Sequence, residues 1–266
     1  MAKILCIGDV MGRPGRAGLA KILPEWREQY RPEAVIANVE NLAHGKGVTL
    51  GTMAELAALG IDVFSSGNHV FDKTGQAEAC FDRYPNLIRP ANYPSSYPGS
   101  GYYRFAIADQ QVLVVNLGGQ VFFEKQFTGP IDNPFTVLDD ILNRESQKGD
   151  IIIIDFHAEA TSEKIALARY VEGRATFAYG THTHVPTADP TIFPKGTAYV
   201  TDIGMTGPQQ SVIGVKIENA LAAFLGHDRF RMEVAEAGIV QATAMLLETK
   251  HNQPISLTRI SDLINL

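Results

Sequence analysis

The chain has 266 residues, 45% of them hydrophobic, with a net charge of −6 at pH 7 and a pI near 5.6. This length allows one large domain or two small ones, each with a buried core. The acidic balance argues against general binding to nucleic acids or anionic membranes, because both need a basic surface.

Cysteine content and hydropathy indicate a cytoplasmic protein. Cys6 and Cys80 are the only cysteines, and Cys6 lies inside an apolar run, so we expect reduced core thiols rather than disulfides. Asp9 interrupts the apolar N-terminus before it reaches the length of a signal-peptide core. No later run approaches the roughly 18 apolar residues of a membrane span.

The first part of the chain alternates apolar runs with amphipathic segments. We expect strands over residues 3–8, 34–38 and 61–65. Helices are expected over residues 14–30 and 49–59, and Gly60 fits a C-terminal cap for the second helix. This order favours parallel strands joined by crossover helices.

The remaining chain predicts a second sheet region. A long loop over 89–102, rich in Pro, Tyr, Ser and Gly, leads into a hairpin of strands 103–108 and 111–116. Residues 150–156 are nearly all apolar, which is typical of a strand buried on both faces. Further elements are a helix over 162–171, a strand over 176–179, a helix near 215–225, and strands over 198–201, 229–236, 239–248 and 254–260.

No linker, repeat or low-complexity stretch divides the sequence. We therefore expect residues 1–266 to form a single domain. The predicted class is α/β, with two sheets packed face to face and helices outside, an α/β/β/α sandwich.

Metal-ligating residue types cluster directly after the predicted strands. The segments are Gly8-Asp9, Asn38-Val39-Glu40-Asn41, Gly67-Asn68-His69, His157-Ala158-Glu159 and Gly180-Thr181-His182-Thr183-His184. In open α/β sheets, ligands gather at the carboxyl ends of the strands. A mixture of carboxylate, amide and imidazole donors suits paired divalent ions of intermediate hardness. The segments together predict a dinuclear metallohydrolase that acts on phosphate esters.

Each donor can be given a role from its chemistry. Glu40 is the natural bridge between two ions, because a carboxylate directly after an apolar run is costly to bury unless it is paired or bound to metal. We expect Asp9, Asn41 and His184 to complete the coordination of the first ion, and Asn68, His157 and His182 that of the second. His69, beside a ligand, is the expected general acid that protonates the leaving alkoxide.

Each residue also has a more ordinary explanation on its own. A lone histidine such as His157 is often a core residue, and Asp9 or Asn68 could cap a helix or form an Asx turn. His69 could be a hydrogen-bond donor outside the metal ligands. Some basic and aromatic residues near these segments could contact a phosphate or a base, namely Arg13, Lys46, Lys73, Phe71, Tyr93 and Phe123. Exposed basic residues are usually solvated and aromatic residues usually belong to the core, so the substrate-binding residues stay unknown.

Longer phrases carry a family resemblance. Gly8-Asp9, Gly67-Asn68-His69, a lone histidine and the double-histidine segment resemble the calcineurin-like metallophosphoesterase superfamily. The similarity to its YmdB-like branch spans nearly the whole chain and rests on residues 41–47, 89–92, 155–164, 180–184, 194–199 and 204–208.

The resemblance implies a bacterial phosphodiesterase that opens 2',3'- or 3',5'-cyclic nucleotides by attack of a metal-bridging hydroxide. It implies two divalent transition-metal ions, with iron or manganese favoured, on the same ligands as above and with His69 as proton donor. The sequence departs from the broad superfamily at Met11, where a histidine is usual, and at Glu40, where the bridge is usually aspartate. An amide oxygen from Asn41 in place of an imidazole hardens the first site, so the metal identity stays open.

Other functions fit the motifs less well. The first glycines do not give the dinucleotide-binding spacing, because Pro14 stands where that motif needs its second glycine. Gly45-Lys46 does not belong to a P-loop, because Glu40 stands where that motif begins with glycine. A metal-stabilised regulatory protein would have no use for an unliganded His69. A phosphomonoesterase or protein phosphatase stays open. The expected partner is a small phosphate ester, and homo-oligomerisation is possible.

Overall fold

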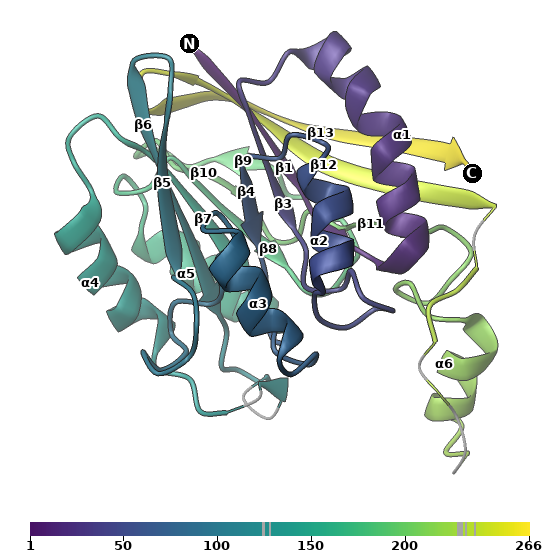
Figure 1. Ribbon diagram of the computed structural model, residues 1–266. Coiled ribbons are helices and arrows are strands. Elements are labelled where there is room, and N and C mark those ends of the chain that lie inside the picture. Colours follow the sequence, from purple (N-terminus) through teal and green to yellow (C-terminus); the bar gives the residue numbers. More distant parts are fainter. Residues whose placement is uncertain (124–125, 128, 228–230, 232, 237) are drawn as a thin grey trace.

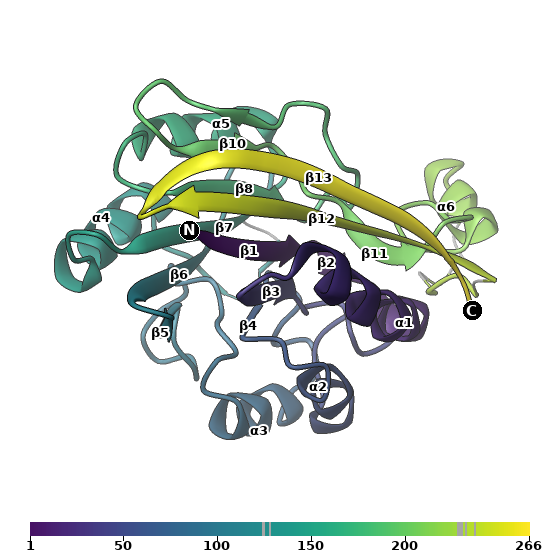
Figure 2. The ribbon, with the colours of Figure 1, turned by 90° about the horizontal axis from the view of Figure 1, so that it is seen from above.

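The computed structural model describes residues 1–266 except 124–125, 128, 228–230, 232 and 237. Two β-sheets lie face to face, with helices on their outer surfaces (Figure 1 and Figure 2). The predicted α/β/β/α sandwich is confirmed. None of the described helices combines the length and apolar character that crossing a membrane requires.

The first sheet has the strand order β2-β11-β12-β1-β3-β4, and β13 pairs with β12. Its central strands β1, β3 and β4 are parallel, whereas β12 runs antiparallel to β1. The strands are β1 (Ala2–Ile7), β2 (Asp9–Val10), β3 (Ala34–Asn38), β4 (Val63–Ser65), β11 (Met205–Pro208), β12 (Ile239–Lys250) and β13 (Gln253–Asn265).

The second sheet has the strand order β5-β6-β7-β8-β10-β9. The predicted hairpin forms its antiparallel edge, and β6, β7, β8 and β10 are parallel. The strands are β5 (Tyr102–Ile107), β6 (Gln110–Gly118), β7 (Ile151–His157), β8 (Phe177–Thr181), β9 (Thr191–Ile192) and β10 (Ala198–Val200).

Helices cover the outer faces of both sheets. The first sheet is covered by α1 (Gly12–Tyr30), α2 (Leu50–Ala57) and α3 (Gln76–Arg83), and the second by α4 (Pro134–Glu145) and α5 (Thr161–Tyr170) (Figure 2). The short helix α6 (Ile217–Phe224) projects from one corner of the sandwich (Figure 1). Thr49 caps α2 in a capping box with Thr52, and Gly60 adopts the left-handed conformation expected after this helix.

The continuous apolar runs follow from burial on both faces of the central strands. In β1, Leu5 and Ile7 pack toward the helices, while Ile4 and Cys6 pack between the sheets. Successive strand residues point to opposite faces, so a strand covered on both sides needs an apolar residue at every position. The same alternation fills β7 with isoleucine.

Some elements differ from the expectation. The helices α3 and α4 and the short strands β2, β9 and β11 were not predicted. The strand expected over 229–236 falls partly on residues outside the described part of the chain, and its described residues form only one bridge, from Val234 to Val215. For the described residues 231 and 233–236 the prediction of a regular strand is wrong, because β11 and β12 on either side of this segment pair with each other and offer it no edge.

Candidate metal centre and active site

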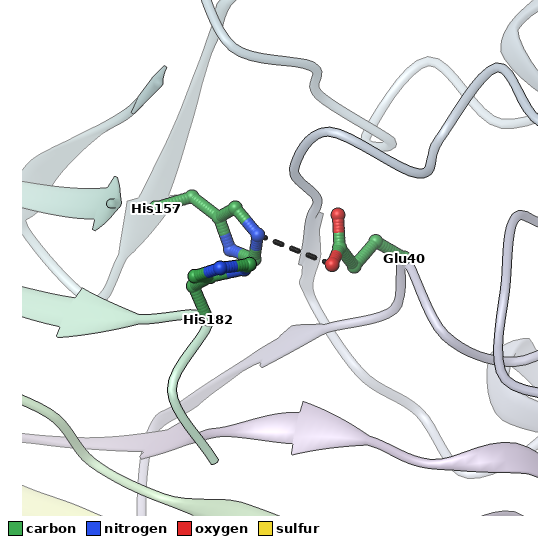
Figure 3. Close-up of side chains that lie close together, drawn as sticks. All are labelled: Glu40, His157 and His182. Atoms are coloured by element: carbon green, nitrogen blue, oxygen red, sulfur yellow. Dashed lines mark ion pairs between the residues drawn. The ribbon is translucent and has the colours of Figure 1, made fainter. Parts of the chain in front are cut away.

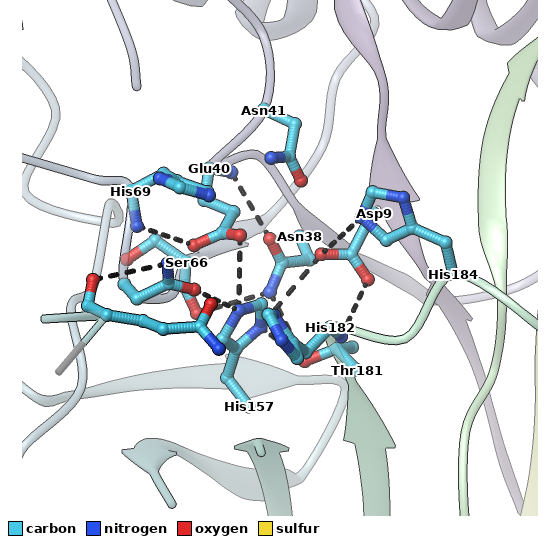
Figure 4. A network of polar contacts seen from close by, with 12 residues as sticks. Asp9, Asn38, Glu40, Asn41, Ser66, His69, His157, Thr181, His182 and His184 are labelled. Atoms are coloured by element: carbon cyan, nitrogen blue, oxygen red, sulfur yellow. Dashed lines mark hydrogen bonds and ion pairs between the residues drawn. The ribbon is translucent and has the colours of Figure 1, made fainter. Parts of the chain in front are cut away.

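The predicted donors converge where the parallel strands of both sheets end (Figure 4). Asp9 follows β1, Glu40 follows β3 and Asn68 follows β4, all in the first sheet. His157 ends β7 and His182 follows β8, both in the second sheet. The site therefore lies across the boundary between the two sheets.

Glu40 and His157 form the middle of the cluster. The Oε1 atom of Glu40 lies 3.1 Å from Nε2 of His157, and Oδ1 of Asn68 lies 3.0 Å from the same nitrogen. Donor atoms of Glu40, His157 and His182 all lie within 4.8 Å of one another (Figure 3). Donors about 3 Å apart can share one ion, since metal–ligand bonds are about 2.0–2.2 Å long.

Asp9, Asn41 and His184 lie on the other side of Glu40 in the same network (Figure 4). Nε2 of His184 is 3.8 Å from Oδ1 of Asp9, and the backbone N–H of His182 donates to Oδ2 of Asp9 at 3.1 Å. The side-chain amide of Asn41 donates to the Gly45 carbonyl at 2.9 Å. This bond orients the amide so that its oxygen stays available.

Within the described part of the chain, three buried oxygens of this cluster have no hydrogen-bond partner: Oδ1 of Asp9, Oε1 of Glu40 and Oδ1 of Asn41. Asp9 is 0% exposed, Glu40 1% and Asn41 3%. Buried polar atoms without partners are costly, particularly on carboxylates. A cation bound among these oxygens would remove that cost, so the residues present fit a metal centre.

The electrostatics of the cluster favour positive charge on His157 but not on His182. Burial raises the pKa of Asp9, although His184 and His157 oppose that rise. Burial opposes ionisation of Glu40 as well, but the neighbouring His157 holds the pKa of this carboxyl below its ordinary value. The same pairing overcomes burial and raises the pKa of His157 to about 9. Burial and the charge of His157 lower the pKa of His182 to about 2.

A chain of hydrogen bonds behind His157 fixes its ring. Nδ1 lies 2.9 Å from the Thr181 hydroxyl, which donates to Oδ1 of Asp155 at 2.7 Å. The other carboxylate oxygen of Asp155 accepts from Asn38 at 3.2 Å and from Ser65. Burial raises the pKa of Asp155 to about 6, against these hydrogen bonds. The sequence analysis missed this support, although an aspartate inside the apolar run 150–156 is a signal that could have indicated it.

The double-histidine loop is held by a buried ion pair. Lys164 Nζ donates to Oδ2 of Asp202 at 2.8 Å and to the Thr181 carbonyl at 2.9 Å, and Asp202 also accepts from the backbone of Thr183. His182 and His184 have positive φ angles of 95° and 64°. Non-glycine residues adopt such angles rarely and only where surrounding contacts impose them.

His69 lies beside the cluster but is oriented by a different partner. Its backbone N–H donates to Oε2 of Glu40 at 3.0 Å, while its Nδ1 is 2.8 Å from Oδ2 of Asp72. The side chain is 22% exposed, so its other nitrogen can be reached from the pocket. The geometry separates His69 from the buried donors, and Asp72 is a partner that the sequence analysis did not name.

A pocket of about 440 Å³ opens onto this cluster. Its lining includes Glu40, Asn41, Lys46, His69, His182 and His184. Of the earlier candidates for substrate contact, Lys46 lines the pocket, whereas Phe123 is buried against the His182 ring with the ring centres 4.3 Å apart. Phe71 and Tyr93 belong to an aromatic cluster in the core.

Comparisons with known proteins agree with this architecture. The profile of the YmdB-like protein family matches residues 5–260. A 2',3'-cyclic-nucleotide 2'-phosphodiesterase of Bacillus subtilis (strain 168) is 43% identical over 234 residues, which cover 88% of this chain and 86% of that protein.

Solved structures give the same result. A phosphatase from Mycoplasma pneumoniae superposes with a TM-score of 0.91 at 33% identity, covering 99% of this chain and 94% of that one. A hypothetical protein from Thermus thermophilus superposes with a TM-score of 0.90 at 39% identity, covering 98% of this chain and 99% of that one. The calcineurin-like phosphoesterase YfkN of Bacillus subtilis superposes with a TM-score of 0.56 at 13% identity, covering 99% of this chain and 90% of that one. At this identity the similarity supports the fold alone.

Proposed function

Because the chain belongs to the YmdB-like protein family and is a hydrolase of phosphoric esters, we propose that it is a metal-dependent phosphodiesterase that opens 2',3'-cyclic nucleotides. The substrate class is carried over from the relative in Bacillus subtilis. We propose further that residues 1–266 act as a single domain.

We infer that two divalent ions bind at the cluster. Asp9, Glu40, Asn41 and His184 would hold one ion, and Glu40, Asn68, His157 and His182 the other, with iron or manganese favoured. When bound, such ions supply Lewis acidity toward the phosphate and activate a water molecule as nucleophile. The observation that carries this proposal is the set of buried oxygens on Asp9, Glu40 and Asn41 that accept no hydrogen bond from the described residues, those of Asp9 and Glu40 facing the neighbouring imidazoles.

His69 is proposed to supply the proton for the leaving oxygen. Water adds to phosphorus and loses one proton to solvent, the bond from phosphorus to the ribose 2'-oxygen breaks, and that oxygen takes a proton from His69, which solvent then reprotonates, so the product is a nucleoside 3'-phosphate. Asp72 holds the imidazole through Nδ1, which leaves Nε2 to face the substrate. Lys46 in the pocket lining offers a cation for a non-bridging phosphate oxygen.

Metal analysis joined to a substrate screen tests the proposal. The purified protein should contain about two equivalents of iron, manganese or a similar ion and should hydrolyse 2',3'-cyclic nucleotides faster than 3',5'-cyclic nucleotides, linear diesters or monoesters. A preference for monoesters would favour a phosphomonoesterase on the same site. Less than about half an equivalent of metal, with activity insensitive to chelators, would rule out the dinuclear centre.

A further inference from the structure

A second cleft adjoins the active-site pocket. It has a volume of about 720 Å³, and its lining includes Arg13, His44, Lys216, Arg231, Glu233 and Glu236. His44 lines both this cleft and the pocket over the metal donors. The two spaces therefore adjoin at His44.

Two arginines of the cleft form no ion pair among the described residues, although Glu236 also lines it and Arg231 acts electrostatically on Glu233. Lys216 is paired with Glu233 at 2.9 Å, so that pair contributes little net charge. Arg13 and Arg231 are exposed, and neither forms an ion pair with any residue in the described part of the chain. Arg13 lies in the first turn of α1, where the helix dipole adds positive potential. Guanidinium groups in this setting suit a phosphate, which they can bind through two parallel hydrogen bonds.

The residue shared by the two spaces is tied to the metal donors. His44 has a φ angle of 58°, which a non-glycine residue adopts rarely. The next residue, Gly45, accepts a hydrogen bond from the Asn41 amide at 2.9 Å. The position of His44 is thus fixed relative to Asn41, and a ligand passing it would be aligned with the proposed reaction centre.

We propose that the preferred substrate is a short RNA whose 3' end carries the 2',3'-cyclic phosphate, a refinement that rests on the proposed function. The terminal nucleotide occupies the active-site pocket. The terminal ribose can extend only through its 5'-oxygen, which in RNA carries a phosphodiester to the preceding nucleotide. That phosphodiester lies at Arg13 and Arg231, and the preceding nucleoside occupies the second cleft. The net charge of −6 restricts binding to the RNA end rather than to nucleic acid in general.

The test compares three substrates with the metal-loaded protein. They are adenosine 2',3'-cyclic phosphate, the same compound with a 5'-phosphate, and the dinucleotide ApA ending in a 2',3'-cyclic phosphate. We expect KM for the dinucleotide to be about tenfold or more below that for the plain mononucleotide, with the 5'-phosphate giving only part of this gain. Such a ratio corresponds to the loss or gain of one charge-assisted hydrogen bond.

Two variants and a matched control locate the effect. Arg13→Ala and Arg231→Ala should each raise KM for the dinucleotide about tenfold and leave the kinetics of the plain mononucleotide unchanged. The control is Lys250→Ala, which removes an exposed cation at the end of β12. This end of β12 pairs with the start of β1, opposite the site, so the control should leave KM unchanged for both substrates. Thermal melting and metal content should match the unchanged protein in all three variants.

The outcomes separate the two proposals. If no cyclic nucleotide is hydrolysed, the proposed function itself fails. If the mononucleotide is hydrolysed but the dinucleotide gives an equal KM, the RNA-end substrate is overturned and the function stands. The RNA-end substrate is also overturned if the 5'-phosphate alone accounts for the whole decrease in KM, or if the arginine variants raise KM equally for the mononucleotide and the dinucleotide.

Discussion

The Thr181 hydroxyl lies 2.9 Å from Nδ1 of His157 and donates its own hydrogen to Asp155. An oxygen that donates to a carboxylate can only accept from the imidazole, so Nδ1 carries the hydrogen of the neutral ring. Nε2, which faces Glu40 and Asn68, is thereby left with its lone pair for a metal ion.

Thr181→Val should therefore weaken metal binding without removing a ligand. Valine keeps the shape of threonine but lacks the hydroxyl, so the ring loses the contact that selects its tautomer. We expect metal affinity to fall by about 10- to 100-fold, measured by competition with a chromophoric chelator. Thr181→Ser keeps the hydroxyl and should restore most of the affinity. Equal losses in the two variants would mean that packing, rather than the hydrogen bond, is responsible.

Glu40→Gln should release both ions together. The substitution removes the carboxylate between Asp9 and His157 and leaves the proposed ions with about one additional uncompensated positive charge. Elemental analysis should find far less than two equivalents of metal, and hydrolysis should be lost. Glu248→Gln, on β12 at the opposite end of the sheet, serves as the control and should retain both. Normal metal content in Glu40→Gln would show that the bridge is assigned wrongly.

His69→Gln should separate proton donation from metal binding. Both ions and the fold should be retained, while turnover of a 2',3'-cyclic nucleotide falls by roughly 10²- to 10⁴-fold, the usual contribution of a general acid. The loss should be small for a p-nitrophenyl phosphodiester, whose leaving group needs no proton. A similar loss on both substrates would instead assign His69 to phosphate orientation, and reduced metal content would assign it to the centre.

Asp72→Asn tests whether the carboxylate acts through His69. Oδ2 of Asp72 lies 2.8 Å from Nδ1 of His69, and Asp72 does not line the pocket over the donors. We expect about a tenfold lower kcat with KM nearly unchanged, and a partial rescue in Asp72→Glu. Combined with His69→Gln, the substitution should cause no further loss, since residues that act as one unit are not additive. Additive losses in the double variant would contradict this coupling.

Metal uptake should release a proton at neutral pH. In the metal-free protein, the carboxylates of Glu40 and Asp9 outweigh burial and raise the pKa of His157 to about 9, so its ring is protonated at pH 7.5. A ligating imidazole must be neutral, and apparent affinity should therefore fall as the pH drops below about 9. His182, with its pKa lowered to about 2, releases no proton. Titration calorimetry in buffers with different ionisation enthalpies measures the release, and heats that are identical in all buffers would refute it.

The same shift predicts how the metal-free protein responds to pH. The pKa of His157 rises from its ordinary value of 6.5 to about 9 on folding, so the stabilisation is fully present below pH 6.5 and is lost as the pH rises through 9. We expect the melting temperature of chelator-treated protein to decrease over this interval. His157→Gln, which removes the titrating ring, should flatten that part of the profile.

The regular elements were predictable where the sequence pattern had a single physical meaning. The strand over 34–38 matches β3 to the residue, because its apolar run is bounded by a polar turn and by the site. The helix α4 was missed although Leu138, Ile141 and Leu142 recur at helical spacing behind an Asn133 cap. The predicted strand over 229–236 failed because pairing depends on a free sheet edge, which local alternation does not reveal.

The site was predictable as a set of residues but not as a geometry. The donors after the strand ends were all named from the sequence, and the structure brings them together; their binding of metal stays a prediction. The supporting contacts could not be derived, since the distance from Thr181 to His157 and that from Lys164 to Asp202 arise only when the sheet and its covering helix pack. The second cleft likewise joins Arg13 to Arg231 across most of the chain.

The position of β12 has a consequence for biosynthesis. This strand pairs directly with β1, with Leu247 opposite Ile4, although nearly the whole chain separates them. While the protein is being made, the strand that precedes Asp9 can pair with β3 but lacks its second neighbour, β12, until residue 250 has left the ribosome. The first sheet behind the ligand set is complete only when β12 has been added, so we expect the ions to be acquired after translation. The metal found in purified protein should consequently follow the ions available during expression and should change when the growth medium is supplemented with iron or with manganese.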